Sequence, residues 1–141
     1  MSRFVLDASV SAAWFLRDPN VDYAIRVRRR LAEGDQAVVP VFWSIEMANV
    51  LARAVRRGNL SLADAEVALG QLEILLVSGP RIEVEPTSPP LWLAYATARK
   101  HQISAYDGVY LELAQREGVP LATLDSGLRA ATGKAGVELL R

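Results

Sequence analysis

One stretch near the start of this chain decides its expected fold class: Arg3-Phe4-Val5-Leu6-Asp7-Ala8-Ser9. Residues 4–6 form a short, continuous apolar run, which is typical of a central strand buried on both faces of a parallel sheet. The run ends at Asp7, and ligands of open α/β sheets gather just outside the carboxyl ends of the strands. Asp7 is therefore a candidate functional residue, although it also suits the N-cap of a helix that begins at Ala8.

The rest of the chain alternates between strand-like and helix-like segments. Short apolar runs predict strands at 4–6, 37–39, 82–84, 119–124 and 137–140. Apolar residues spaced three and four apart predict helices at 8–17, 21–31, 42–57, 61–77, 91–103, 104–117 and around 128–131. This alternation predicts an α/β fold with a central, mostly parallel sheet covered by helices on both sides.

Three of these segments carry more specific expectations. The helices at 42–57 and 61–77 should form an antiparallel hairpin, because only a short turn joins them. The second of these helices should stop at Ser78-Gly79-Pro80. The strand at 82–84 alternates apolar and polar residues, as a strand at the edge of a sheet does. The residues of the helix at 91–103 that should face the core are Leu91, Leu93 or Trp92, Ala94 and Ala98.

Composition bounds the class of protein. The 141 residues fit one domain spanning 1–141, and 51% hydrophobic and 23% charged residues are ordinary for a compact fold. The 16 basic and 16 acidic residues cancel, so any binding to nucleic acid must depend on local patches. The absence of cysteine excludes disulfides, thiolate catalysis and cysteine–zinc sites, and agrees with a reducing cytosol.

The N-terminus also favours a cytoplasmic location. Met1-Ser2-Arg3 leads directly into the first predicted strand, with no long apolar segment and no small-residue cleavage site. No stretch reaches the roughly 18 apolar residues that a membrane span requires. The expectation is a protein that is neither secreted nor bound to a membrane.

Four acidic residues stand at element boundaries or just inside a helix: Asp7, Glu46, Asp107 and Asp125. In a parallel sheet, all four would lie at the carboxyl edge. Carboxylates forced together repel each other, and a bound cation or a raised pKa relieves that repulsion. A site of oxygen ligands suits Mg²⁺ or Mn²⁺, and such a site can support hydrolysis of a phosphodiester.

Four segments, in this order, resemble the motifs of the PIN-domain family, and more closely those of the VapC-type toxins of toxin–antitoxin pairs: 5–10 (VLDASV), 43–51 (WSIEMANVL), 104–107 (SAYD) and 122–125 (ATLD). The resemblance covers nearly the whole chain. It implies a three-layer PIN-like fold and a metal-dependent endoribonuclease that acts as the toxin of a two-protein module. It also implies a homodimer and a small antitoxin whose tail reaches into the pocket.

The resemblance implies a role for each acid. Asp7, Glu46, Asp107 and Asp125 would bind one or two Mg²⁺ or Mn²⁺ ions and orient a hydrolytic water. Asp7 and Asp107 are expected as direct ligands. Glu46 and Asp125 would bind through water or serve a second ion, and members of the family vary at the position of Asp125.

Other polar residues could support this pocket. Ser9, Asn49 and Thr123 would fix carboxylate rotamers by hydrogen bonds, although each also suits an ordinary helix-start, helix-face or strand-end position. Arg53 and Arg56, shortly beyond Glu46, could contact an RNA backbone, while a solvated helix face is the alternative.

Two other functions fit part of this pattern. A binding or regulatory domain would keep the acidic pocket without turnover. A metal-dependent phosphatase of another doubly wound fold would use Asp7 as its nucleophile, but that chemistry wants a second acid two residues later, where Ser9 stands. The only histidine, His101, lies near a predicted helix end, and no nucleophile-elbow pattern supports a Ser-His-Asp triad.

Overall fold

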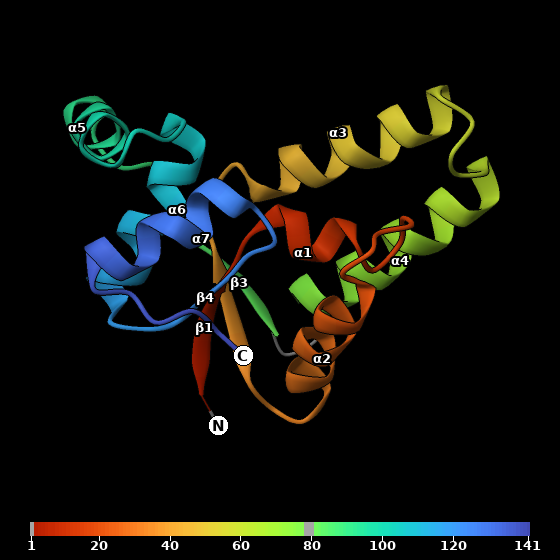
Figure 1. Cartoon of the computed structure of the whole chain (residues 1–141). Coiled ribbons are helices and arrows are strands. Elements are labelled where there is room, and N and C mark those ends of the chain that lie inside the picture. Colours follow the sequence, from red (N-terminus) through yellow and green to blue (C-terminus); the bar gives the residue numbers. More distant parts are fainter. Residues whose placement is uncertain (1, 78–80) are drawn as a thin grey trace.

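The computed structural model describes residues 2–77 and 81–141, and four strands within them form one parallel sheet (Figure 1). The strands are β1 (Arg3–Leu6), β2 (Gln36–Val39), β3 (Ile82–Val84) and β4 (Leu121–Ala122), and their order in the sheet is β3-β2-β1-β4. The helices are α1 (Ala8–Ala12), α2 (Val21–Ala32), α3 (Trp43–Arg56), α4 (Leu62–Val77), α5 (Leu91–His101), α6 (Ala105–Glu117) and α7 (Ser126–Ala135).

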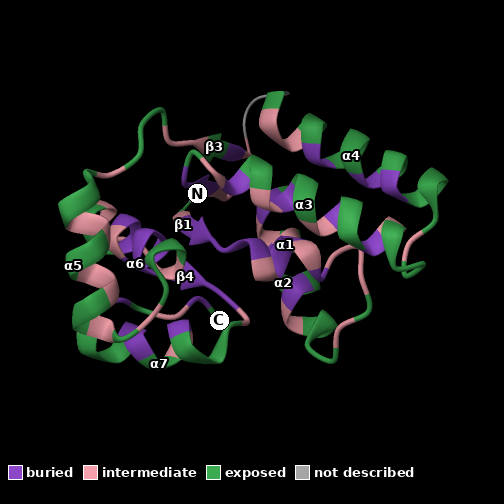
Figure 2. Cartoon of the chain, turned by 90° about the horizontal axis from the view of Figure 1, so that it is seen from above, coloured by how far each residue is buried: buried purple, intermediate pink, exposed green. Residues whose placement is uncertain are grey.

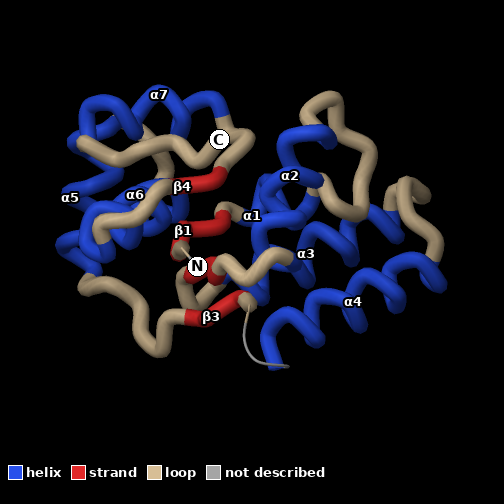
Figure 3. Tube along the Cα trace, turned by 90° about the horizontal axis from the view of Figure 1, so that it is seen from below, coloured by secondary structure: helices blue, strands red, loops and turns tan. Residues whose placement is uncertain are grey.

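Helices cover both faces of this sheet, which gives three layers. Seen from below, α5, α6 and α7 lie on one side of the column of strands, and α1 to α4 lie on the other (Figure 3). Helices α3 and α4 run side by side as the predicted hairpin (Figure 2). The expected α/β class and parallel sheet are confirmed. The predicted stop at 78–80 lies outside the described residues.

Strand β1 occupies the interior of the sheet, as its apolar run predicts. Val5 pairs with Val38 of β2 on one side and with Leu121 of β4 on the other. Phe4, Val5 and Leu6 are almost wholly buried, because helices cover both faces of the strand (Figure 2). Strand β3 lies at an edge of the sheet, also as predicted.

The direction of the strands places three connections at one edge. Strand β1 leads into α1, β2 into α3 and β4 into α7, and all three strands are parallel. Their carboxyl ends therefore face the same way. The Asp7 backbone N–H donates to the Ala122 carbonyl at 3.0 Å, so β1 and β4 remain joined just beyond their last paired residues.

Several predicted boundaries are wrong, and the predicted strand at 119–124 is reduced to Leu121–Ala122. Helix α1 stops at Ala12 instead of reaching residue 17, because the chain tightens there into turns in which the N–H groups of residues 13–15 each donate to the carbonyl three residues earlier. The predicted strand at 137–140 is reduced to a single bridge between Leu121 and Leu139. Only two backbone hydrogen bonds, both to Leu121, hold this last segment against β4.

The predicted core face of α5 is wrong for Leu91 and Trp92, whereas Leu93, Ala94 and Ala98 are half-buried. No residue of α5 is buried, and Leu91 and Trp92 are 87% and 69% exposed. The helix packs on α6 instead of on the sheet, and its Ala98 backbone nitrogen lies 3.3 Å from where a Cβ on Gly108 would be. In the part of the chain that the structure describes, no helix is long and apolar enough to cross a membrane.

Candidate active site

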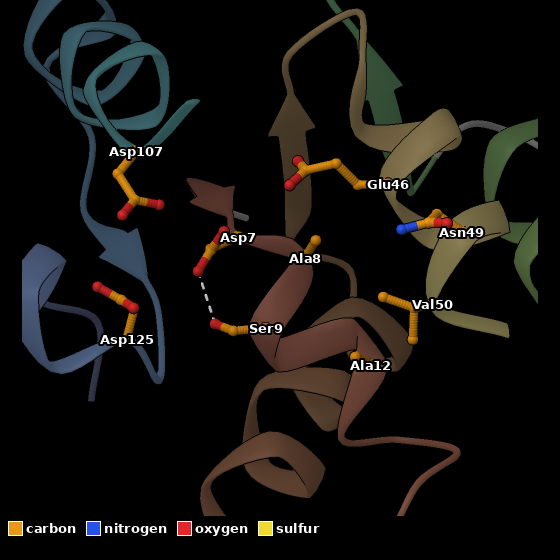
Figure 4. A pocket seen from close by; sticks show the side chains of 9 residues that line it. All are labelled: Asp7, Ala8, Ser9, Ala12, Glu46, Asn49, Val50, Asp107 and Asp125. Carbon is orange, nitrogen blue, oxygen red and sulfur yellow. Dashed lines mark hydrogen bonds between the residues drawn. The ribbon is translucent and has the colours of Figure 1, made fainter. Parts of the chain in front are cut away.

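A pocket of about 280 Å³ opens at the carboxyl edge of the sheet (Figure 4). Residues from α1, α3 and α6, together with the connections after β1 and β4, line it: Asp7, Ala8, Ser9, Ala12, Glu46, Asn49, Val50, Asp107 and Asp125. All four predicted acids are among them. Figure 4 shows Asp107 and Asp125 on one side of Asp7 and Glu46 on the other. Residues up to 118 positions apart in the sequence therefore share one cavity.

Asp7 lies at the bottom of this arrangement and is only 5% exposed. Its Oδ2 atom accepts hydrogen bonds from the Ser9 hydroxyl at 2.6 Å and from the Thr123 hydroxyl at 2.7 Å. Asp7 occupies the N-cap position of α1, yet its side chain makes no capping hydrogen bond there. Helix capping therefore does not explain this aspartate, whose carboxylate is held by two hydroxyl groups.

The two hydroxyls that hold Asp7 are themselves fixed by backbone. The Leu124 N–H donates to Ser9 Oγ, and the Asp125 N–H donates to Thr123 Oγ1, each at 3.0 Å. With its oxygen accepting from the backbone, each hydroxyl has its proton free to donate to Asp7. This network joins the ends of β1 and β4 and sets the direction of one buried carboxylate.

Asp107 and Asp125 are held by helix starts. The Asp107 backbone N–H donates to the hydroxyl of Ser104, the N-cap residue of α6, at 3.1 Å. Asp125 is the N-cap of α7, where its Oδ2 accepts from the Leu128 N–H at 2.8 Å. Asp125 therefore caps α7 while it lines the pocket.

Glu46 reaches the pocket from the first turn of α3. Its Oε1 atom accepts a hydrogen bond from the Tyr110 hydroxyl at 2.6 Å. Burial raises the pKa of Glu46; the Tyr110 hydrogen bond acts in the opposite direction, and the charges of Asp7 and Asp107 add to the rise. Burial, followed by the charges of Asp7 and Glu46, raises the pKa of Tyr110, so this hydroxyl remains a protonated donor. Tyr110 is not among the residues predicted from the sequence, although it follows Asp107 by about one helical turn.

The environment of the pocket opposes ionisation of Asp7 and Asp107, as it does for Glu46. Burial is the main cause that raises the pKa of Asp7, which its two hydroxyl donors partly offset. Burial, followed by the charges of Asp125 and Asp7, raises the pKa of Asp107 to about 6. Within residues 2–77 and 81–141, none of the four acids forms an ion pair with a basic side chain.

This donor set fits a hard divalent cation. The polar groups of the pocket are carboxylate, hydroxyl and amide oxygens without sulfur or imidazole, which is the ligand chemistry of Mg²⁺ and Mn²⁺. A cation would also relieve the repulsion that raises the pKa of Asp107. Among the described residues, however, no three acids already stand in metal-ligating geometry. Asp7, Asp107, Asp125 and Glu46 share a pocket whose carboxylates would have to close around an ion.

The remaining predicted residues lie along α3. Asn49 lines the pocket one turn after Glu46 and is exposed, and no hydrogen bond joins it to any of the four acids in the described structure. Arg53 and Arg56 are exposed and lie outside the pocket lining. Arg53 follows Glu46 by seven residues, so both lie on nearly the same face of the helix.

Comparisons with known proteins agree with this geometry. The chain is 34% identical to Ribonuclease VapC1 of Mycobacterium tuberculosis over 107 aligned residues, and this alignment covers 76% of each protein. It is 30% identical to Ribonuclease VapC3 of Pyrobaculum aerophilum over 126 aligned residues, and this alignment covers 89% of the chain and 92% of that protein.

Solved structures and a family model complete these comparisons. The fold is similar to the crystal structure of PAE2754 from Pyrobaculum aerophilum, with a TM-score of 0.66 and 23% sequence identity, over 92% of this chain and 84% of that one. A family model described as PIN domain matches residues 4–134. The chain therefore belongs to the PIN-domain family.

Proposed function

We propose that this chain is a single-domain, metal-dependent endoribonuclease that hydrolyses RNA phosphodiester bonds. The observation that carries the proposal is the convergence of Asp7, Glu46, Asp107 and Asp125 on one pocket at the carboxyl edge of the sheet. Its similarity to proteins named Ribonuclease VapC supports the reaction class.

The four acids would hold one or two Mg²⁺ or Mn²⁺ ions, with Asp7 and Asp107 as direct ligands. A bound ion would supply Lewis acidity toward the phosphate and lower the pKa of a coordinated water. Asp7 is suited to a fixed ligand position, because Ser9 and Thr123 hold one of its oxygens and its burial excludes competing water. Glu46 and Asp125 would bind an ion through water and orient water around the scissile phosphate.

The test is cleavage of RNA by matched aspartate variants. Asp107→Asn should reduce cleavage at least a hundredfold, because it removes a ligand charge while keeping the shape of the side chain. Asp22→Asn, an identical change at an exposed position in the first turn of α2, should cleave at the wild-type rate. Assays with Mn²⁺, Mg²⁺ and EDTA would establish the metal requirement.

Two outcomes would contradict the proposal. Full activity of Asp107→Asn would remove this acid from the reaction. A wild-type protein that binds Mn²⁺ and RNA but cleaves no RNA would instead be a PIN-like binding domain. A folded, inactive Asp107→Asn protein beside active Asp22→Asn supports the ribonuclease.

We also propose that the protein is the toxin of a cytoplasmic toxin–antitoxin pair and forms a homodimer. Two sets of exposed apolar side chains offer contact surfaces. The first, which we name the α3–α4 patch, comprises Ile45 of α3 and, on more than one side of α4, Leu62, Val67, Leu69, Ile74 and Val77. The second, the α5 patch, consists of Leu91, Trp92 and Tyr95. An antitoxin tail that enters the pocket along α3 would pass Ile45, so we assign the α3–α4 patch to the antitoxin and the α5 patch to a second copy of the chain.

A further inference from the structure

We infer that Tyr110 is a positioning residue for the pocket: its hydroxyl fixes the Glu46 carboxylate so that one oxygen is held and the other is presented to the pocket. This inference rests on the proposed ribonuclease function and assigns that function a residue outside the four acids. The role of Tyr110 would be to set the position of the Glu46 carboxylate relative to Asp107 and Asp125, which lie on the other side of Asp7.

The hydrogen bond that carries the inference is short and sheltered. Tyr110 Oη donates to Glu46 Oε1 at 2.6 Å, and Tyr110 is 0% exposed. A side chain without solvent exposure cannot contact RNA, so any effect of this hydroxyl on the reaction must pass through Glu46. Glu46 itself lines the pocket and is half-buried.

Phe42 fixes both partners of this bond. The Glu46 N–H donates to the Phe42 carbonyl at 3.0 Å, which holds the start of α3. The ring of Phe42 packs edge-on against the ring of Tyr110, with centroids 5.7 Å apart and an interplanar angle of 87°. The backbone of Phe42 thus holds the backbone of Glu46, and the ring of Phe42 packs against Tyr110. Together with the Tyr110 hydroxyl, these contacts leave the Glu46 side chain little freedom to turn away from Tyr110.

The same contacts link the two sides of the pocket. Tyr110 follows Asp107 by three residues in α6, so both lie on one face of that helix. Asp107 is placed by the start of α6, and Glu46, on α3, is tied to the next turn of α6. One helix therefore carries one acid and anchors another, which sets how far apart the two carboxylates stand across Asp7.

The experiment uses Tyr110→Phe, which removes the hydroxyl and keeps the buried ring. Mn²⁺ affinity, measured by electron paramagnetic resonance without RNA, should fall about tenfold, which is within the usual effect of outer-shell partners. Tyr95→Phe is the control, because it removes an exposed hydroxyl from α5, outside the pocket lining. This control should keep wild-type Mn²⁺ affinity, and thermal unfolding of both variants would show that each is folded.

A double-mutant cycle shows whether Tyr110 acts through Glu46. In a Glu46→Gln background, Tyr110→Phe should cause no further loss of Mn²⁺ affinity or of RNA cleavage. Wild-type affinity in Tyr110→Phe, or an equal loss in both backgrounds, would overturn the inference while the ribonuclease stands. A wild-type protein that neither binds Mn²⁺ nor cleaves RNA would overturn the proposed function and this inference with it.

Discussion

Thr123 Oγ1 lies 2.7 Å from Asp7 Oδ2, in a hydrogen bond between residues 116 positions apart in the sequence. Thr123 follows β4 and Asp7 follows β1, and these two parallel strands are neighbours in the sheet. The bond therefore exists only when the two strand ends are correctly aligned. Both residues are buried, so this contact couples the alignment of the sheet to the direction of the most buried carboxylate.

Replacing Thr123 by Val tests this coupling. The variant keeps the shape of the side chain but leaves the Asp125 N–H without its acceptor and Asp7 with one hydroxyl donor fewer. We expect the free energy of unfolding to fall by about 1–2 kcal/mol. RNA cleavage should fall by about 10–100-fold, because an outer-shell partner of a metal ligand is lost. Urea unfolding and a cleavage assay measure the two effects.

Thr132→Val is the control for this prediction. Thr132 is also buried, and its hydroxyl donates to the Arg129 carbonyl at 2.7 Å within α7. Its loss should reduce stability by a similar amount and leave cleavage unchanged. Equal losses of activity in both variants would show that Thr123 matters only for folding.

The raised pKa of Asp107 predicts how stability depends on pH without metal. In the folded protein the pKa of Asp107 is about 6, whereas the ordinary pKa of an aspartate, which describes the unfolded chain, is 3.8. Between these values the folded state binds more protons, so stability rises as the pH falls. Asp107 is half-exposed, and we therefore expect a gain of only about 1 kcal/mol from pH 7.5 to pH 5 in urea unfolding with EDTA. The raised pKa values of Asp7 and Glu46 act in the same direction.

Asp107→Asn should remove most of this pH dependence. The variant no longer places a third charge beside Asp7 and Asp125, so at pH 7.5 without metal it should be more stable than wild type by about 1 kcal/mol, or a few degrees in Tm. Added Mn²⁺ should raise the Tm of wild type more than that of the variant. A metal-free variant less stable than wild type would mean that Asp107 makes a stabilising contact that outweighs the repulsion.

The strands and the acids that follow them could be predicted from the sequence, because both depend on the order of residues within short segments of the chain. An apolar run that ends in Asp7 specifies a buried strand and its carboxyl end at once, and the same holds for the run before Asp125. A parallel sheet then brings these ends together whatever the details of packing. The four acids could therefore be predicted from their positions, whereas Ser9 and Thr123 were predicted through the resemblance to the PIN-domain family.

Features that depend on which surfaces meet could not be predicted in this way. Apolar residues of α5 follow helical spacing, but the helix rests on α6, so Leu91 and Trp92 stay exposed. Tyr110 is one of several apolar-looking residues in α6, and only the position of α3 reveals that its hydroxyl meets Glu46. The segment at 137–140 has a strand-like composition, yet the chain pairs there through Leu121 alone.

The exposed α5 patch predicts the surface of the proposed homodimer. Leu91→Glu should convert a dimer into a monomer, because a charge at an apolar interface is buried without a partner. Val67→Glu, on the exposed face of α4, is the matched control and should leave the mass unchanged. Sedimentation velocity at equal protein concentrations measures the mass. A dimer that survives Leu91→Glu and dissociates with Val67→Glu would reverse this assignment.

The position of Arg53 on α3 predicts which basic residue contacts the RNA backbone. Successive residues turn by about 100° around a helix, so Arg53, seven residues after Glu46, is displaced by only about 20° from that acid. Arg56 is displaced by about 80° and should contribute less. In the inactive Asp107→Asn background, Arg53→Ala should weaken binding of a fluorescent single-stranded RNA several-fold. It should also reduce the dependence of log K on log salt by about 0.7, the value for one phosphate contact.

Arg99→Ala provides the comparison for Arg53, since Arg99 is exposed on α5 and lies outside the pocket lining. It should change neither the affinity nor the salt dependence. A larger effect from Arg56 than from Arg53 would mean that the RNA leaves the pocket across a different face of α3. Equal, small effects from all three variants would mean that the RNA follows another path from the acids. The salt dependence separates these cases from a loss of folding, because a misfolded protein loses affinity without the change expected for one phosphate contact.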